Sequence, residues 1–369
     1  MFEFNHIIYI LLFISIIIIL VLLFLYLIKN NKKKQNITNK LQKKVINEDY
    51  YEKNYNIYFL NKYEGKQLIN KHHQIYLKKL QKLELNKKNI NINDSDFNNF
   101  NNRIHILNSF YNNNILEFTK DEKDKIIFTI HLTLKNINPK ISKNIINNYF
   151  KNWNILKVSN LFEDKLPHTI HNVIILPQDF ITLLKKINEN QNENQNILIK
   201  EIGSTLLHEQ IHIWQRLHPK LFNTLYVKYW NFKKGPCNII NNILEKENNI
   251  FQRKNPDGLD ENWLFNYTNN EYLLISVKLK NDSKDLGDIQ KYGILLSKDN
   301  YEIITIQKLN TFKYFYSFFG IKDNNYHPNE LSASMISENL FLPQFFNNKN
   351  IMDSISFKNL EKWIILILF

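Results

Sequence analysis

The sequence has 369 residues, a formal net charge of +13 at pH 7 and a single cysteine, Cys237. One cysteine excludes a framework of intramolecular disulfides, which agrees with a reducing compartment. The positive charge is nearly all lysine, with arginine only at positions 103, 216 and 253. Since nucleic-acid-binding proteins gather arginine and aromatic side chains in one groove, no nucleic-acid partner is expected.

An apolar run near the N-terminus predicts a membrane anchor. Residues 7–28 are almost wholly apolar, and about 20 apolar residues suffice to cross a bilayer. Lysines follow the run, without the small residues of a signal-peptide cleavage site. We therefore expect residues 1–28 to be an uncleaved transmembrane helix in the lipid bilayer. The positive-inside rule then predicts a single-pass membrane protein with its catalytic domain in the cytosol.

The next two regions are polar. Residues 29–50 predict a basic juxtamembrane linker, which is either solvated or held on anionic lipid headgroups. Residues 51–116 carry helix-like runs between asparagine tracts, which predicts a helical N-terminal region. Its adjacent pair His72 and His73 cannot share one helix face, so both are expected at the surface.

Periodicity and capping signals predict the elements that follow. Thr119 and Glu122 form a capping-box pattern, which indicates the start of a helix. The expected elements, in chain order, are helices over 119–137 and 142–153 and strands over 154–158 and 169–176.

The sequence His208-Glu209-Gln210-Ile211-His212 lies within a pattern that predicts a helix over about 196–217. Residues four apart lie on one face of a helix, so both imidazoles can reach one ion. Imidazole suits zinc, and two histidines from one turn supply half of a tetrahedral site. Glu209 is then placed to act as general base on a water activated by the metal. The competing interpretation is a buried helix whose histidines are satisfied by hydrogen bonds.

This helix resembles the active-site helix of zinc metallopeptidases with the HExxH motif, the zincins. Their extended motif favours threonine or valine three residues before the first histidine, and Thr205 stands there. The resemblance implies Zn²⁺ as cofactor and a peptide or protein as substrate. The order of two helices, strands and then the metal helix also resembles the N-terminal part of a zincin domain. In such folds an edge strand grips an extended peptide above the zinc, which nominates 169–176 for that role.

A catalytic zinc needs a third protein ligand and one open position. His218 stands ten residues after His208, which is the spacing of the metzincin pattern HExxHxxGxxH. That pattern needs a glycine where this chain has Gln215, a good helix former. A helix that continues through Gln215 turns His218 away from the metal. His218 is therefore the weaker candidate.

Glu330 is the stronger candidate for the third ligand, in a segment where Pro328 predicts the start of a helix. The segment resembles the glutamate helix of the gluzincins, the thermolysin-like group, at Asn329, Glu330 and Ala333. The resemblance implies that Glu330 completes the zinc site. Ser334 departs from the family pattern, because many relatives have an aspartate there that orients the first zinc histidine.

Further polar residues stand near these motifs. The resemblance implies that Tyr326 or His327 stabilises the oxyanion. Arg216 lies two turns after the first motif histidine and is expected to contact either a substrate carboxylate or carbonyl, or a neighbouring acid. Asp257 and Asp260 stand in a turn signal and are expected to belong to an ordinary turn, not a calcium site.

The expected fold class is α+β. A zincin-like catalytic domain over 117–369 would consist of helices and a small mixed sheet, with an edge strand over the active-site helix. Alternating patterns at 272–279, 294–296 and 301–306 predict a β-rich insertion over about 255–312. One transmembrane helix would precede this domain.

The expected function is a membrane-anchored, zinc-dependent metallopeptidase. His208, His212 and Glu330 would hold zinc, and Glu209 would be the general base. One alternative is a catalytically inactive, zincin-like protein that acts as a membrane-tethered binding or structural module. Another is a basic membrane-surface protein that holds no metal.

Overall fold

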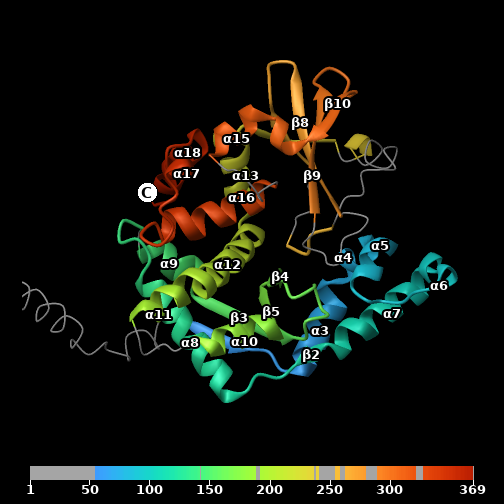
Figure 1. Cartoon of the computed structure of the whole chain (residues 1–369), viewed down its shortest axis with the longest axis vertical. Helices are drawn as coiled ribbons and strands as arrows, with labels where there is room; N and C mark the ends of the chain where they lie inside the picture. Colours follow the sequence, from blue (N-terminus) through green and yellow to red (C-terminus); the bar gives the residue numbers. More distant parts are fainter. Residues whose placement is uncertain are drawn as a thin grey trace, which may run out of the picture. The chain divides into compact units, whose positions relative to one another are not determined.

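The computed structural model describes residues 55–141, 143–187, 192–236, 238–240, 254–257, 262–279, 289–320 and 327–368. These residues form an α+β fold with two separate sheets (Figure 1). The expected anchor at 7–28 and linker at 29–50 lie outside the described residues. In the part of the chain that the structure describes, no helix is both long and apolar enough to cross a bilayer.

The first sheet has the strand order β1-β3-β5-β4, and β2 also pairs with β3. The strands β1, β3 and β5 run parallel, while β4 runs antiparallel to β5 and forms an edge. Since β1 comes from the N-terminal helical region, that region shares a sheet with the rest of the described chain. The strands are β1 (Asn56–Phe59), β2 (Ile115–Leu116), β3 (Asn152–Val158), β4 (His168–Ile170) and β5 (Val173–Pro177).

The single strand expected over 169–176 is instead the hairpin of β4 and β5. The chain reverses between them at His171, whose φ is 56°, and at Asn172. The single-strand prediction was wrong because apolar side chains continue on both sides of this turn. Of the two strands of this hairpin, β4 lies at an edge of the sheet, whereas β5 lies between β3 and β4.

Helices cover both faces of the first sheet. Side chains of β5 alternate between two cores, with Ile174 and Leu176 in the larger and Val173 and Ile175 in the smaller. The larger core is covered by α8 (Lys120–Lys135), α9 (Lys143–Tyr149), α10 (Gln178–Lys186) and α12 (Ser204–Leu217). The smaller core is covered by α3 (Lys62–His72), α4 (Gln74–Lys79), α5 (Lys82–Lys87) and α7 (Phe100–Asn113), and α6 (Asp94–Asn98) precedes α7.

The capping box expected at the start of α8 is confirmed. The hydroxyl of Thr119 accepts from the backbone N–H of Glu122 at 3.3 Å, and Glu122 accepts from the backbone N–H of Thr119 at 2.9 Å. The carboxylate of Glu122 also pairs with Lys157 of β3 at 2.8 Å. This pair connects the start of α8 to the sheet.

The smaller core contains a histidine that was expected at the surface. His72 is exposed, but His73 is only 2% exposed and contacts the rings of Tyr76 and Tyr111. Burial lowers the pKa of His73 to about 3, so this imidazole is neutral at pH 7. The expectation of a surface position was wrong for His73, because neighbouring aromatic side chains enclose it.

The helix expected over 196–217 consists of α11 (Asn192–Ile197), a π-helical segment (Leu198–Gly203) and α12. Gly203 stands where α12 begins. A Cβ atom on Gly203 would lie 2.1 Å from the hydroxyl oxygen of Thr133 on α8. Glycine therefore lets α12 begin in close contact with α8.

The second sheet is antiparallel throughout, with the order β10-β9-β8-β7-β6. It extends from Phe232 to Lys308, so it starts before the expected insertion over 255–312. Its strands are β6 (Phe232–Lys234), β7 (Trp263–Asn266), β8 (Glu271–Leu279), β9 (Ile289–Ser297) and β10 (Ile303–Lys308). Before it come α13 (Pro219–Thr224) and a π-helical segment (Leu225–Tyr229), and after it a 3₁₀ turn (Leu309–Thr311) and α15 (Lys313–Phe319).

The C-terminal helices return to α12. The helix α16 (Pro328–Ser334) continues into a π-helical segment (Met335–Phe341), and both pack along α12 (Figure 1). Pro328 occupies the first turn of α16, as expected. Two further helices complete the described chain, α17 (Lys349–Met352) and α18 (Ile355–Leu368).

Candidate metal centre

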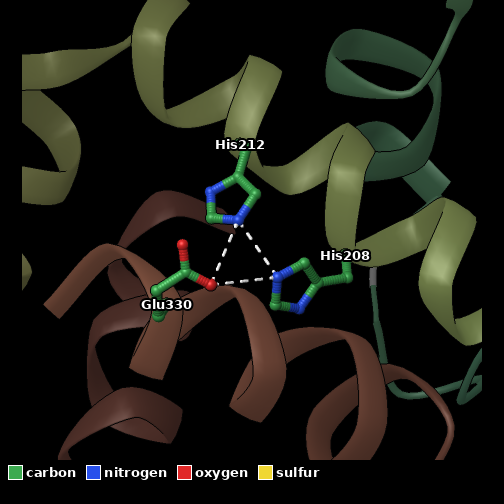
Figure 2. A group of neighbouring side chains, drawn as sticks. All are labelled: His208, His212 and Glu330. Carbon is green, nitrogen blue, oxygen red and sulfur yellow. Dashed lines mark hydrogen bonds and ion pairs between the residues drawn. The ribbon is translucent and has the colours of Figure 1, made fainter. Parts of the chain in front are cut away.

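Three side chains of the two packed helices α12 and α16 converge on one point. His208 and His212 lie one turn apart on α12, and Glu330 lies in the first turn of α16. The two Nε2 atoms are 3.0 Å apart. Oε2 of Glu330 lies 3.3 Å from Nε2 of His208 and 3.6 Å from Nε2 of His212 (Figure 2). Residues that are distant in sequence thus present three donor atoms to the same small space.

The spacing of the three donor atoms fits one metal ion. Zinc binds imidazole nitrogen and carboxylate oxygen at about 2.0–2.2 Å, so tetrahedral ligand atoms lie about 3.4 Å apart. The separations of 3.0, 3.3 and 3.6 Å bracket that distance. Two imidazoles and one carboxylate also match the ligand chemistry of a catalytic zinc with one position left open.

Gln215 determines the orientation of the His212 ring. Its amide nitrogen donates to the backbone oxygen of Asn329 at 2.8 Å and to the hydroxyl of Ser332 at 2.9 Å. Its amide oxygen therefore faces Nδ1 of His212, at 2.8 Å. Nδ1 of the neutral ring must then carry the hydrogen, which leaves the lone pair of Nε2 directed toward Glu330.

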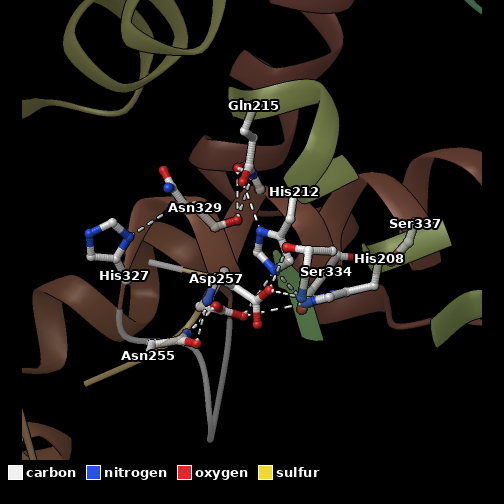
Figure 3. Close-up of polar contacts among 12 residues, drawn as sticks. His208, His212, Gln215, Asn255, Asp257, His327, Asn329, Ser334 and Ser337 are labelled. Atoms are coloured by element: carbon white, nitrogen blue, oxygen red, sulfur yellow. Dashed lines mark hydrogen bonds and ion pairs between the residues drawn. The ribbon is translucent and has the colours of Figure 1, made fainter. Parts of the chain in front are cut away.

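The ring of His208 is held less firmly. The hydroxyl of Ser334 lies 3.5 Å from Nδ1 of His208, at the limit of a hydrogen bond (Figure 3). Besides Glu330, a second carboxylate stands one turn beyond Ser334, at Glu338 in the π-helical segment. Burial raises the pKa of Glu338, and the charge of His208 opposes this. The gluzincin pattern has an aspartate at the position of Ser334. In this chain, the carboxylate of Glu338 acts on His208 instead.

The electrostatics couple Glu330 to both histidines. Burial alone would lower the pKa of His212, but the carboxylate of Glu330 raises it to about 10. Burial likewise opposes ionisation of Glu330, yet His212 and His208 hold its pKa well below the usual range. These opposite shifts favour a proton shared between Glu330 and the imidazoles, and a cation bound at the same place would compete with that proton.

Glu209 points into the same region from α12. Its side chain is buried, and its Oε2 has no hydrogen-bond partner among the described residues. Burial raises the pKa of Glu209 well above its usual range, and the carboxylate of Asp257 raises it further. One carboxylate oxygen of Glu209 lies within 4.8 Å of a ring nitrogen of His212 and a carboxylate oxygen of Asp257.

The segment 254–257 also contributes to this region. Asn255 donates to Oε1 of Glu330 at 2.6 Å, and Asp257 approaches Glu209 and His212 (Figure 3). The sequence indicated only a turn here. A turn signal does not reveal which distant side chains the turn contacts, so Asn255 and Asp257 were not identified as site residues.

Among the other sequence-predicted residues, those that the structure describes are not part of the group formed by His208, His212 and Glu330. His218 ends α12 and contacts the ring of Tyr149, with 4.9 Å between ring centroids, and the structure does not group it with His208 and His212. His327 caps α16, where its Nδ1 accepts from the backbone N–H of Asn329 at 3.3 Å. Tyr326 and Asp260 lie outside the described residues.

Arg216, His168 in β4 and His171 just after β4 contact other side chains and backbone groups of the protein. Arg216 pairs with Asp257 at 3.7 Å, which is the contact with a neighbouring acid that was one of its two expected roles. His168 is buried against Phe162, and its Nδ1 lies 3.1 Å from the backbone oxygen of Leu166. His171 stacks on His72, with 4.1 Å between ring centroids.

No family model matches this chain, and comparisons with curated proteins and with solved structures gave no match.

Proposed function

We propose that this protein is a zinc-dependent metallopeptidase of gluzincin type. His208, His212 and Glu330 would hold the zinc ion, and Glu209 would act as general base. The observation that carries the proposal is the convergence of three donor atoms from α12 and α16 to separations of 3.0–3.6 Å. The position of β4 at the edge of its sheet, beside α12, supports a peptide substrate, since an edge strand can pair with an extended chain once the side chains that now occupy its backbone groups are displaced.

Each residue has a defined task in this proposal. A bound zinc ion would lower the pKa of water and polarise a peptide carbonyl. Glu209 would take the proton from the attacking water and pass it to the leaving amine. Gln215 would keep Nε2 of His212 free of hydrogen. The oxyanion donor remains a proposal from the resemblance alone, with Tyr326 and His327 as the candidates.

We also propose, from the sequence, that residues 7–28 anchor the protein in a membrane with the catalytic domain in the cytosol. Fusion of a reporter to the C-terminus would test this orientation. Protection of the reporter from external protease in intact cells is the expected result, and digestion would contradict it.

The proposed activity is tested by metal content and hydrolysis together. The full-length protein should copurify with one zinc ion per chain and cleave members of a mixed peptide library. Glu209→Gln should keep the zinc and lose at least a thousandfold in turnover, since it removes the base and not a ligand. His208→Ala should lose the zinc as well. Glu201→Gln, an exposed glutamate that precedes α12, is the matched control and should resemble the wild type.

A second candidate function is a zincin-like binding protein that does not cleave. The position of Asp257 favours it, because a carboxylate there lies within 4.8 Å of the proposed base. One zinc ion per chain without turnover on any peptide of the library would support this candidate. Absence of zinc from both wild type and Glu209→Gln would exclude both functions.

A further inference from the structure

The edge strand β4 has its outward-facing groups occupied by side chains of the same chain. The backbone N–H of Thr169 donates to Oδ1 of Asp257 at 2.5 Å, and its hydroxyl donates to the same oxygen at 2.6 Å. The backbone oxygen of Thr169 accepts from Arg216 at 3.3 Å. Both backbone groups of Thr169 thus point away from β5, in the direction from which a peptide strand would pair.

Arg216 provides a positive charge at this point. It lies on α12 two turns after His208, and its side chain is 18% exposed. It donates to the backbone oxygen of His171 at 2.7 Å and to the hydroxyl of Thr169. These contacts fix the guanidinium on the hairpin of β4 and β5. Asp257 supplies its negative partner at 3.7 Å.

Asp257 reaches this position on a segment that is also connected to the metal centre. Asn255 donates to Oε1 of Glu330 at 2.6 Å, and the backbone N–H of Lys254 donates to Glu84 at 2.7 Å. The segment 254–257 therefore lies between β4 and the three converging side chains. A peptide bound along β4 and cleaved at this centre would need the same space.

We propose that Thr169 and Arg216 form a carboxylate-binding subsite for the substrate, which Asp257 fills in the free protein. An acidic group of the peptide would take the place of the Asp257 carboxylate. This inference rests on the proposed function, and it names the class of substrate: peptides that carry a carboxylate beside the cleaved bond.

The charge of Arg216 explains why the exchange is selective. When a peptide carboxylate replaces Asp257, the guanidinium keeps a negative partner and its hydrogen-bonding geometry. When a neutral peptide displaces Asp257, the guanidinium is left largely buried without a counter-charge, which opposes binding. The carboxylate could belong to an acidic side chain or to the C-terminus of the peptide. Both sources offer the same chemistry, so the experiment must separate them.

The test measures peptide binding in the Glu209→Gln background, where cleavage does not interfere. Three fluorescent octapeptides are titrated into the full-length protein and followed by anisotropy. The first is neutral and blocked at both ends, the second has one internal aspartate, and the third has a free C-terminal carboxylate. We expect one or both carboxylate peptides to bind at least tenfold more tightly than the neutral one. The peptide that does so identifies the source.

Substitutions in the subsite then test whether Arg216, Asp257 and Thr169 cause the preference for a carboxylate peptide. Asp257→Asn should increase the preference at least tenfold further, because it removes the competing charge. Arg216→Gln should abolish the preference, and Arg216→Lys should restore part of it. Thr169→Val removes one donor while keeping a strand-forming residue, so it tests the subsite if Arg216→Gln does not fold. Asp299→Asn, at an exposed turn, is the control and should change nothing.

Equal affinity for the three peptides, or a preference that survives Arg216→Gln, would overturn the proposal. These results are independent of the catalytic proposal, because zinc content and cleavage are measured separately. Acid-selective binding without zinc would support the subsite and contradict the metallopeptidase. Zinc-dependent cleavage without acid selectivity would support the metallopeptidase and contradict the subsite.

Discussion

Gln215 connects His212 to the helix that carries Glu330. Its amide oxygen lies 2.8 Å from Nδ1 of His212, while its amide nitrogen donates to the backbone of α16 at Asn329. One side chain thus orients the ring and also joins the two helices whose packing brings the donor atoms together. All of its contacts are buried, so water does not replace them easily.

Replacement of Gln215 by leucine should weaken zinc binding more than it weakens the fold. Without the amide oxygen, the hydrogen on His212 is free to move to Nε2, the atom that would bind the metal. We expect the dissociation constant for zinc to rise by about tenfold to a hundredfold, as measured by competition with a chromophoric chelator. Gln210→Leu is the matched control, since this buried glutamine on α12 contacts Asn152 and not His212. Equal effects of both variants would show that Gln215 has no specific role.

The sequence was sufficient for the α+β class and for much of the site. The spacing of His208 and His212 determines that they share a helix face, and Pro328 indicated the start of the helix that carries Glu330. These inferences depend on short-range geometry, which a sequence contains. The structure brings the three nominated side chains together, while their binding of zinc stays a prediction.

Contacts between distant segments could not be predicted in the same way. In the sequence, Gln215 was notable only because it stands where the metzincin pattern has a glycine. Its hydrogen bond to His212 depends on the position of α16. Asp257 and Asn255 reach the site through a turn whose path no periodicity encodes. His73 was assigned to the surface because it cannot share one helix face with His72, but aromatic residues from other segments enclose it. The position of each of these residues depends on a tertiary contact, which local conformational preferences do not encode.

The metal-free protein should lose stability as the pH rises. The pKa of His212 is raised from 6.5 to about 10, against the effect of burial, by Glu330. A raised pKa in the folded state contributes stability that is complete below pH 6.5 and lost as the pH approaches 10. The shift corresponds to at most about 5 kcal/mol. Urea denaturation of the chelator-treated protein between these pH values should show the decline.

The variant Glu330→Gln tests whether the charge of Glu330 causes this decline in stability. It removes the charge that holds the proton on His212, so the free energy of unfolding should become nearly independent of pH over the same range. A decline of equal size in Glu330→Gln would contradict the assignment. Zinc should reverse the dependence in the wild type, because the ion competes with the proton and binds more tightly at higher pH.

Substitutions of two residues near His208 should differ in their effect on the affinity for zinc. Ser334 lies 3.5 Å from Nδ1 of His208, which is too long for a strong hydrogen bond. Ser334→Ala should therefore change the dissociation constant by less than about twofold. Glu338→Gln removes a partly buried negative charge that acts on His208 and should raise the constant by about threefold to tenfold. The opposite ranking would show that the serine hydroxyl orients the ring.

A buried ion pair beside the smaller core should contribute to its stability. Lys88 pairs with Glu163, with side chains that are 0% and 1% exposed. The hydroxyls of Tyr76 and Tyr111 also donate to Glu163, at 2.9 and 2.7 Å. Burial would raise the pKa of Glu163, but Lys88 lowers it to about 2. A depressed carboxylate pKa contributes stability above pH 4.5 that is lost as the pH falls toward 2.

Lys88→Met leaves the buried carboxylate without its counter-charge and should lower the free energy of unfolding by about 3–5 kcal/mol. Replacing both partners, as Lys88→Met with Glu163→Leu, should recover much of that loss, because the isolated charge is then gone. The exposed pair Lys82 and Asp94 is the control, where Lys82→Met should cost less than about 1 kcal/mol. Urea denaturation at pH 7 compares the four proteins. If the double variant is as unstable as Lys88→Met, the loss of stability comes from packing or from the tyrosine hydrogen bonds. It does not then come from a buried carboxylate without a counter-charge.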